Sequence, residues 1–157
     1  MAKLKNITGT WQGVYSFDDT QILGLQSVPF TLTIKQRWFG RFRGTVTDDA
    51  PPGMPGDGAI EGYFSFPRIE FMKAMPVCYI ATPDRRVLTL REYLIENGET
   101  CEHDVPHRPI LYEGSFLSPT RAEGTWIIKA GVAALGDGRG VRLGEVTGTW
   151  TMQPRAA

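Results

Sequence analysis

The sequence predicts an all-β protein: a closed antiparallel up-and-down β-barrel of eight to ten strands with one helix. Three observations predict it. A five-residue pattern with a central glycine recurs six times along the 157 residues. Apolar and polar residues alternate through most segments between turns, as in half-buried strands. The 18 glycines and 11 prolines indicate many turns. The length suits one compact domain, so we expect residues 1–157 to form a single barrel domain.

The recurring pattern appears as ITGTW (7–11), FRGTV (42–46), IEGYF (60–64), YEGSF (112–116), AEGTW (122–126) and VTGTW (146–150). Side chains alternate between the two faces of a strand, so the apolar first and fifth positions share one face with the glycine. A glycine weakens a strand, but on the inner face it lets the sheet bend and makes room for aromatic rings. The pattern therefore favours a closed barrel over a two-sheet sandwich, which is the alternative.

Taken in order, the expected strands cover residues 9–17, 28–36, 41–48, 59–66, 68–75, 109–116, 121–130 and 142–153. Between the fifth and sixth, TPDRRVLTLREYLIENGE predicts a helix, with Thr82 as N-cap, Pro83 as first residue and Asn97-Gly98 as its end. This helix is expected to cover one mouth of the barrel. GVAALGDGRG is expected to be the loop that joins the last two strands. The loop with Asp48, Asp49 and Asp57 lacks the ligand spacing of calcium-binding loops, so these residues are expected to serve turn formation.

The opening ITGTW and the late GTW resemble the calycin superfamily, which includes avidins, lipocalins, fatty-acid-binding proteins and nitrobindin-like barrels. The resemblance implies an antiparallel barrel plugged by a tryptophan, with a small, mostly apolar molecule inside. It does not carry over the residues that bind biotin in avidins, because Gly13 and Phe17 stand at those positions. Arg155 lies past the last strand, where it does not match the carboxylate-binding arginine of the fatty-acid binders, and no histidine follows His107 to match a haem ligand.

The segment RIEFMKAM is expected to bring a charge into the barrel. Alternation places Lys73 on one face of the strand and Arg68 with Glu70 on the other, so either orientation turns a charge inward. An inward charge needs a partner, such as a ligand carboxylate or carbonyl, unless it lies near the rim and reaches water.

The segment CEHDVPH groups Cys101, His103, Asp104 and His107, all of which can bind a transition metal. Their spacing matches no established zinc pattern, so a solvated loop is the expectation and no metal is predicted.

The chain carries 17 basic and 17 acidic residues, which predicts neither a nucleic-acid nor a membrane partner. Two cysteines and the absence of an apolar leader predict a cytoplasmic protein with free thiols.

Together these features predict a small-molecule carrier or sensor, without a cofactor, that holds an apolar or amphipathic ligand in the barrel interior. The expected binding residues are Trp11, Tyr15, Phe64, Glu70, Lys73, Tyr112, Trp126 and Trp150. The alternatives are a small barrel enzyme with Lys73 and Glu70 as acid and base, and a scaffold protein with a solid core. Homo-oligomer formation is left open.

Overall fold

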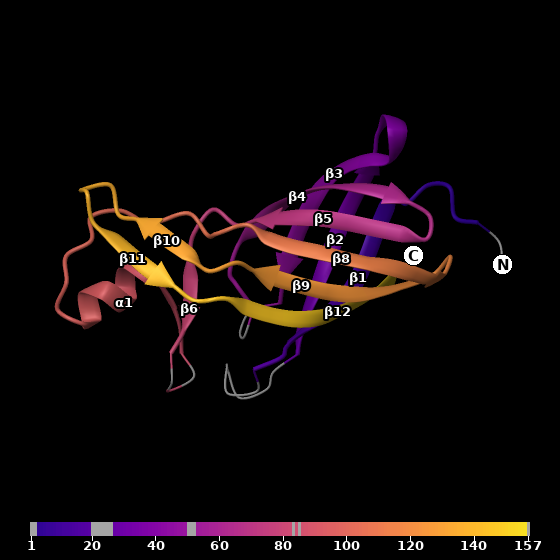
Figure 1. Ribbon diagram of the computed structural model, residues 1–157. Helices are drawn as coiled ribbons and strands as arrows, with labels where there is room; N and C mark the ends of the chain where they lie inside the picture. Colours follow the sequence, from indigo (N-terminus) through magenta and orange to yellow (C-terminus); the bar gives the residue numbers. More distant parts are fainter. Residues whose placement is uncertain (1–2, 20–26, 50–52, 83, 85, 157) are drawn as a thin grey trace.

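The computed structural model describes residues 3–19, 27–49, 53–82, 84 and 86–156. Eight antiparallel strands close into a barrel, in the order β1-β12-β9-β8-β5-β4-β3-β2 (Figure 1). The barrel strands are β1 (Gly9–Phe17), β2 (Val28–Gln36), β3 (Arg41–Asp48), β4 (Asp57–Ser65), β5 (Arg68–Ala74), β8 (Ile110–Ser118), β9 (Arg121–Ile128) and β12 (Val146–Pro154). Each strand follows the previous one around the wall, and β12 pairs with β1 to close it. The predicted closed antiparallel barrel is confirmed, and its eight strands overlap the eight predicted segments. The last predicted strand, 142–153, begins too early, because residues 142–143 belong to a separate short strand and β12 starts at Val146.

The central glycines do face into the barrel, where neighbouring strands approach closely. A Cβ atom at Gly148 would overlap the Ser16 carbonyl oxygen and the Trp126 indole, and one at Gly114 would overlap the Glu123 carbonyl oxygen. The same holds at Gly44, Gly62 and Gly124, whose added Cβ would meet a backbone carbonyl of the adjacent strand. Gly9 differs, because its Cβ would meet no atom within 4 Å and its φ is +141°.

Indoles fill the space above two of these glycines, Trp126 above Gly148 and Trp150 above Gly114. Gly148 pairs in register with Trp126, and Gly124 pairs with Trp150. Each indole donates its N–H to strand carbonyls: Trp126 Nε1 to the Ser16 and Thr149 oxygens, both at 3.2 Å, and Trp150 Nε1 to the Thr125 oxygen at 3.0 Å. Glycine thus allows a large ring to lie flat on the neighbouring strand with its polar atom satisfied.

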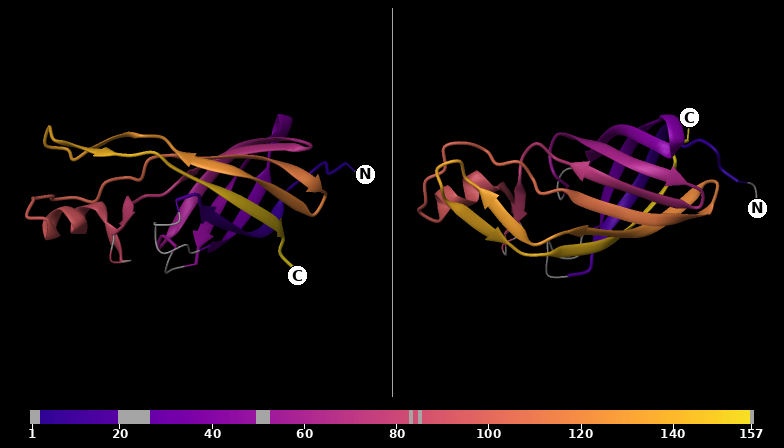
Figure 2. Two further views of the ribbon diagram at one scale, coloured as in Figure 1. Left: turned by 60° about the horizontal axis from the view of Figure 1, so that its bottom comes forward. Right: turned by 45° about the horizontal axis from the view of Figure 1, so that its top comes forward.

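Four short strands and the helix lie beyond one end of the barrel, as Figures 1 and 2 show. They are β6 (Tyr79–Ala81), β7 (Val87–Thr89), α1 (Leu90–Glu96), β10 (Gly131–Ala134) and β11 (Gly140–Leu143). We call them, with their connections, the extension. β6 pairs with β7, and β10 pairs with β11, so the predicted loop GVAALGDGRG is a hairpin with strands of its own. Buried Cys78, Leu90, Leu94, Cys101, Val105 and Ala133 give the extension a separate small core.

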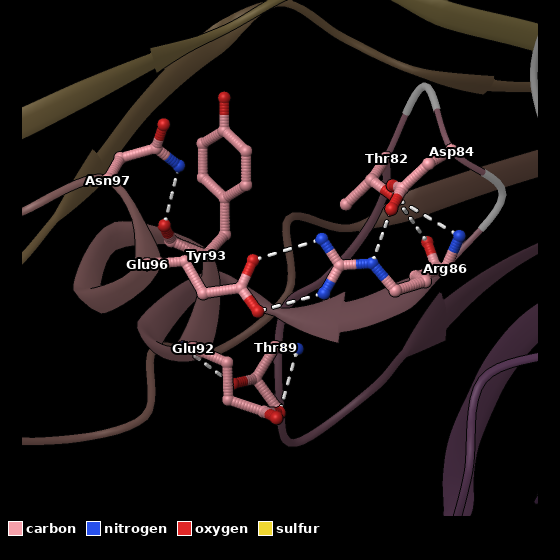
Figure 3. Close-up of polar contacts among 8 residues, drawn as sticks. All are labelled: Thr82, Asp84, Arg86, Thr89, Glu92, Tyr93, Glu96 and Asn97. Carbon is pink, nitrogen blue, oxygen red and sulfur yellow. Dashed lines mark hydrogen bonds and ion pairs between the residues drawn. The ribbon is translucent and has the colours of Figure 1, made fainter.

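The helix begins later than the sequence predicts. Residues Val87–Thr89 form β7, and α1 starts at Leu90 with Thr89 as its N-cap. Thr89 accepts from the Glu92 N–H at 3.0 Å, and the Glu92 carboxylate accepts from the Thr89 N–H at 3.1 Å, a capping box that stops the helix from extending backwards (Figure 3). The predicted end at Asn97-Gly98 is confirmed by the φ of +82° at Gly98.

The predicted N-cap Thr82 belongs to the β6–β7 turn instead, and Pro83 lies outside the described residues. Thr82 Oγ1 contacts the Asp84 carboxylate and accepts from the Arg86 N–H at 3.0 Å. Arg86 then reaches Glu96 on α1 with a two-pronged contact of 2.8 and 3.1 Å, which ties the turn to the helix (Figure 3). Among the described residues, no helix has the length and apolar character needed to cross a bilayer.

Candidate functional site

A cavity of about 300 Å³ lies where the barrel opens toward the extension. We call this the extension end of the barrel, formed by the last residues of β1, β3, β5 and β9 and the first residues of β2, β4, β8 and β12. The walls are mostly apolar and come from both parts of the molecule. Barrel residues that line it include Phe17, Ile110, Trp126, Ile128 and Val146, and extension residues include Ile80, Ala81, Val87 and Leu143. The prediction that the helix covers the mouth of the barrel is wrong, because α1 contributes none of the described lining residues. β6 and β7 cover the mouth instead.

The floor of the cavity is Lys73, which forms a buried ion pair with Asp48 behind it. Lys73 is 1% exposed and Asp48 is 4% exposed, and Lys73 Nζ lies 2.7 Å from both carboxylate oxygens of Asp48. Tyr15 donates its hydroxyl to Asp48 Oδ2 at 3.0 Å, and its ring centroid is 5.1 Å from Lys73 Nζ. Because the Asp48 carboxylate accepts from both neighbours, neither buried charge is left alone. The sequence prediction of a charge inside the barrel is therefore confirmed, and the structure selects Lys73 over Arg68 and Glu70 as the inward residue. The alternative of a charge at the rim is wrong, and the partner is the protein's own carboxylate.

The environment shifts the proton affinity of these groups. Burial lowers the pKa of Lys73, and the Asp48 carboxylate opposes that shift. Burial, followed by the charge of Asp48, raises the pKa of Tyr15 far above its ordinary value. Lys73 has three N–H donors, and its two contacts to Asp48 use at most two of them, so at least one donor is not bonded to Asp48.

Tyr112 supplies a second polar group on the cavity wall. Its ring stacks on Phe71 with centroids 4.6 Å apart and planes within 8°. The side chain is 5% exposed, and its hydroxyl makes no hydrogen bond with any described residue. Burial raises the pKa of Tyr112, so the hydroxyl stays neutral. A hydroxyl on a cavity wall that no described residue pairs with is a place where a ligand can supply the partner.

Three titratable groups of the extension border the cavity on the other side. His107 Nδ1 lies 2.6 Å from the Arg108 carbonyl oxygen, which makes Nδ1 the donor and leaves Nε2 as an acceptor. Burial lowers the pKa of His107 and raises the pKa of the Cys78 thiol, so both side chains are neutral at physiological pH.

Arg108 joins the barrel to the extension and brings a positive charge to the cavity. Its Nη1 donates to the carbonyl oxygens of Lys129 at 2.7 Å and Gly144 at 2.8 Å, and so crosslinks the two chain segments that lead into β10 and out of β11. Its Nε is buried without a hydrogen-bond partner, and no described carboxylate pairs with the guanidinium. Burial lowers the pKa of Arg108.

Four of the eight binding residues expected from the sequence line the cavity: Tyr15, Lys73, Tyr112 and Trp126. The other four lie elsewhere. Trp150 packs in the middle of the barrel core, and Trp11 and Phe64 fill its opposite end, where both contact Phe116 edge-on. Glu70 is exposed on the outer face of β5. Residues three apart in a strand point to opposite faces, so the structure does not bring Glu70 and Lys73 together.

Asp48 is the residue of the site that sequence reasoning missed. A signal was present, because Phe42, Val46 and Asp48 share one phase of the β3 alternation, and that phase faces inward. The sequence alone does not predict the pairing of Asp48 with Lys73, because β4 separates β3 from β5 in the wall and the two side chains meet only across the interior.

The residues considered for metal binding do not come together. Cys101 donates to the His103 carbonyl oxygen at 3.2 Å in the extension, whereas His107 lines the cavity. The described residues contain no group of three or more His, Cys, Asp or Glu side chains placed to hold a metal ion.

Comparison with known proteins supports the fold. No protein-family model matches the sequence, and the search of curated proteins gives no match either. Among solved structures, EF1p2_mFAP2b bound to DFHBI is similar over 94% of this chain and 93% of that one, with a TM-score of 0.56 and 14% identity. A redesigned beta barrel is similar over 95% of this chain and 91% of that one, with a TM-score of 0.50 and 13% identity. The S-type phycobiliprotein lyase CPES from Guillardia theta matches over 96% and 88% of the two chains at 11% identity, with a TM-score of only 0.39. At these identities the likeness concerns the barrel fold alone.

Proposed function

We propose that this protein is a carrier or sensor that binds one small amphipathic molecule in the cavity between the barrel and the extension. In this proposal residues 1–157 act as one calycin-like binding domain, and the ligand sits at the extension end of the barrel. The barrel interior beyond the Lys73–Asp48 pair is filled by packed aromatic side chains, which leave the mouth as the place for a ligand.

The observation that carries the proposal is the combination of apolar walls with polar groups that lack protein partners. Trp126, Ile110 and Ile128 offer surfaces for an apolar or aromatic body. The Tyr112 hydroxyl and the remaining N–H of Lys73 offer a donor or acceptor at the floor. Binding pockets for small molecules have this composition, with a few convergent polar groups in an apolar cavity of roughly 300–1,000 Å³.

The charge of Arg108 favours a ligand with an anionic group. No described carboxylate forms an ion pair with it, the Lys73–Asp48 pair is neutral as a unit, and Glu145, the other charged residue that lines the cavity, is exposed to solvent. A ligand that lies with its apolar part against Trp126 and its anionic group toward Arg108 would satisfy both sides of the cavity. The fold itself is compatible with this use, since the similar barrel EF1p2_mFAP2b is bound to DFHBI.

The test uses 1-anilinonaphthalene-8-sulfonate, an anion with an aromatic body, as the probe. Fluorescence titration of the folded protein should show saturable binding. Ala81→Trp and Gly144→Trp place an indole at the cavity, where Ala81 is exposed and a Cβ at Gly144 meets no atom within 4 Å, so both variants are expected to fold and to lose probe binding. Val132→Trp is the matched control, because Val132 is 63% exposed and does not line the cavity.

Equal probe binding by all three variants would contradict the proposal, because the cavity would then not be the site. Native mass spectrometry of gently purified protein provides an independent measurement. A retained small molecule in the wild type that is lost in Gly144→Trp would identify the natural ligand by its mass.

A further inference from the structure

The end of the barrel opposite the extension, which we call the far end, carries exposed positive charge. It is formed by the chain before β1, the β2–β3, β4–β5 and β8–β9 turns and the end of β12. Its basic residues are Lys3, Lys5, Lys35, Arg37, Arg41, Arg68, Arg121 and Arg155, all of them exposed. None of these forms an ion pair with a described residue.

The far end also lacks acidic residues. The segments that build it, residues 3–9, 35–41, 65–68, 117–121 and 153–156, contain no aspartate or glutamate. Glu61, Glu70, Glu113 and Glu123 lie on the barrel wall, and the remaining acidic residues lie at the extension end or in the extension. The chain has equal numbers of basic and acidic residues, 17 of each, but they are separated in space. Positive charge gathers at the far end, and most negative charge lies toward the extension.

Two aromatic side chains stand at the tip of the β2–β3 turn. Trp38 is 86% exposed and Phe39 is 89% exposed, within the single 3-10 turn Trp38–Gly40 that projects above the barrel in Figure 1. Leu117, next to the last residue of β8 at the same end, is 51% exposed. Phe39 has a φ of +56°, in the left-handed region that a bulky residue rarely adopts. The rings contribute little to the core, so their presence at a tip that glycine or asparagine would form more readily needs a reason outside the fold.

We infer that the far end docks on the surface of an anionic lipid membrane, with Trp38 and Phe39 in the interfacial layer and the basic residues against the headgroups. Tryptophan is favoured at the boundary between headgroups and acyl chains, and each lysine or arginine near an anionic leaflet strengthens attachment. Such peripheral binding combines a small apolar insertion with electrostatic attraction. Proteins that bind single-stranded nucleic acid place their aromatic side chains along a basic groove, where successive bases stack on them. Trp38 and Phe39 instead protrude together at the tip of one turn, which favours a membrane as the partner.

This inference does not depend on the proposed ligand. The cavity lies at the extension end, so a docked molecule would keep the mouth of the cavity away from the membrane. A cavity-blocking variant such as Gly144→Trp should therefore keep full membrane binding, and the two proposals can fail separately.

The experiment is co-sedimentation of the full chain with vesicles of phosphatidylcholine alone and of equal parts phosphatidylcholine and phosphatidylserine. We expect binding to the mixed vesicles, weaker binding at higher salt, and little binding to phosphatidylcholine. The Trp38→Ala/Phe39→Ala variant removes the inserted rings, and Arg37→Glu/Arg41→Glu reverses two charges. Each arginine lost near the surface should weaken partitioning about fivefold, so Arg37→Glu/Arg41→Glu should bind at least tenfold more weakly. Trp38→Ala/Phe39→Ala loses the apolar insertion and should also bind more weakly than the wild type.

Two controls match these variants. Val132→Ala removes an exposed apolar side chain of the extension, and Arg142→Glu reverses an exposed charge there, and both should bind like the wild type. Equal binding to both kinds of vesicle, or unchanged binding by the two far-end variants, would overturn the inference. So would binding of a labelled single-stranded RNA by a protein that ignores the mixed vesicles, since that outcome would assign the same charges to nucleic acid.

Discussion

Lys73 and Asp48 form an ion pair inside the barrel, with Lys73 Nζ 2.7 Å from the Asp48 carboxylate oxygens and both residues nearly inaccessible to solvent. The pair stands between the packed aromatic core and the cavity, with Tyr15 as the third member. It therefore affects both the stability of the barrel and the chemistry of the cavity floor.

Breaking the pair should be costly. Lys73→Met leaves the Asp48 charge buried without its main partner, and we expect the free energy of unfolding to fall by about 3–5 kcal/mol in urea titrations followed by circular dichroism. Arg43→Met is the matched control, because the Arg43–Glu61 pair is exposed and its loss should cost less than about 1 kcal/mol. The double variant Lys73→Met/Asp48→Leu should be more stable than Lys73→Met alone. If Lys73→Met costs no more than Arg43→Met, the pair is not buried in solution.

An inward glycine should not tolerate a side chain. Gly148→Ala would place a methyl group against the Ser16 carbonyl and the Trp126 indole, and we expect a loss of about 1–3 kcal/mol or more from overpacking. Gly144→Ala has open space around the new methyl group and should change stability little. Thermal unfolding of the two variants measures the difference, and similar midpoints would show that the strands lie farther apart than described here.

Acid should destabilise the protein partly through His107. Burial lowers the pKa of His107 from 6.5, so below that pH the unfolded chain takes up a proton that the folded chain does not. This contribution is present above pH 6.5 and is lost as the pH falls toward the lowered pKa. Unfolding titrations over this range should show a flatter pH dependence for His107→Gln than for the wild type, and equal slopes would contradict the burial of His107.

Alkali should destabilise the barrel through its buried tyrosines. Burial raises the pKa of Tyr112 above 10.0, so above that pH the unfolded chain loses a proton that the folded chain retains, and stability falls as pH rises. Tyr112→Phe loses no hydrogen bond to a described residue and should reduce this loss. Tyr63→Phe, at a site 47% exposed on the outer wall, serves as control. An identical alkaline profile for all three proteins would contradict the burial of Tyr112.

The capping box should hold the start of α1. Thr89→Ala removes the acceptor for the Glu92 N–H, and we expect local opening of α1 to become easier by about 1 kcal/mol. Hydrogen exchange of the α1 amides reports this opening, while the barrel amides should exchange as before because α1 lies in the extension. Thr45→Ala, on the outer face of β3, should leave α1 exchange unchanged.

Local patterns decided which elements sequence reasoning found. The barrel strands follow from alternation and from the glycine pattern, because each depends on neighbours within the same strand. The helix was placed too early because Thr82 and Pro83 form a plausible start, whereas the capping box at Thr89 and Glu92 is the start that the fold uses. The short strands of the extension were missed, since three or four residues are too few to show a period.

The sequence by itself determined the inward face of the strands that carry the glycine pattern, the presence of a charge inside the barrel and the closure of the wall around aromatic rings. Only the structure showed that Lys73 is that inward charge. Only the tertiary structure decided that Asp48 is the partner of Lys73, that Tyr112 and Arg108 meet at one cavity, and that the basic residues gather at the far end. Alternation along a strand is a local property of the chain. Contacts across the barrel depend on the order and register of the strands. The same two properties decide at which end of the barrel each turn lies, and no single segment of the sequence encodes them.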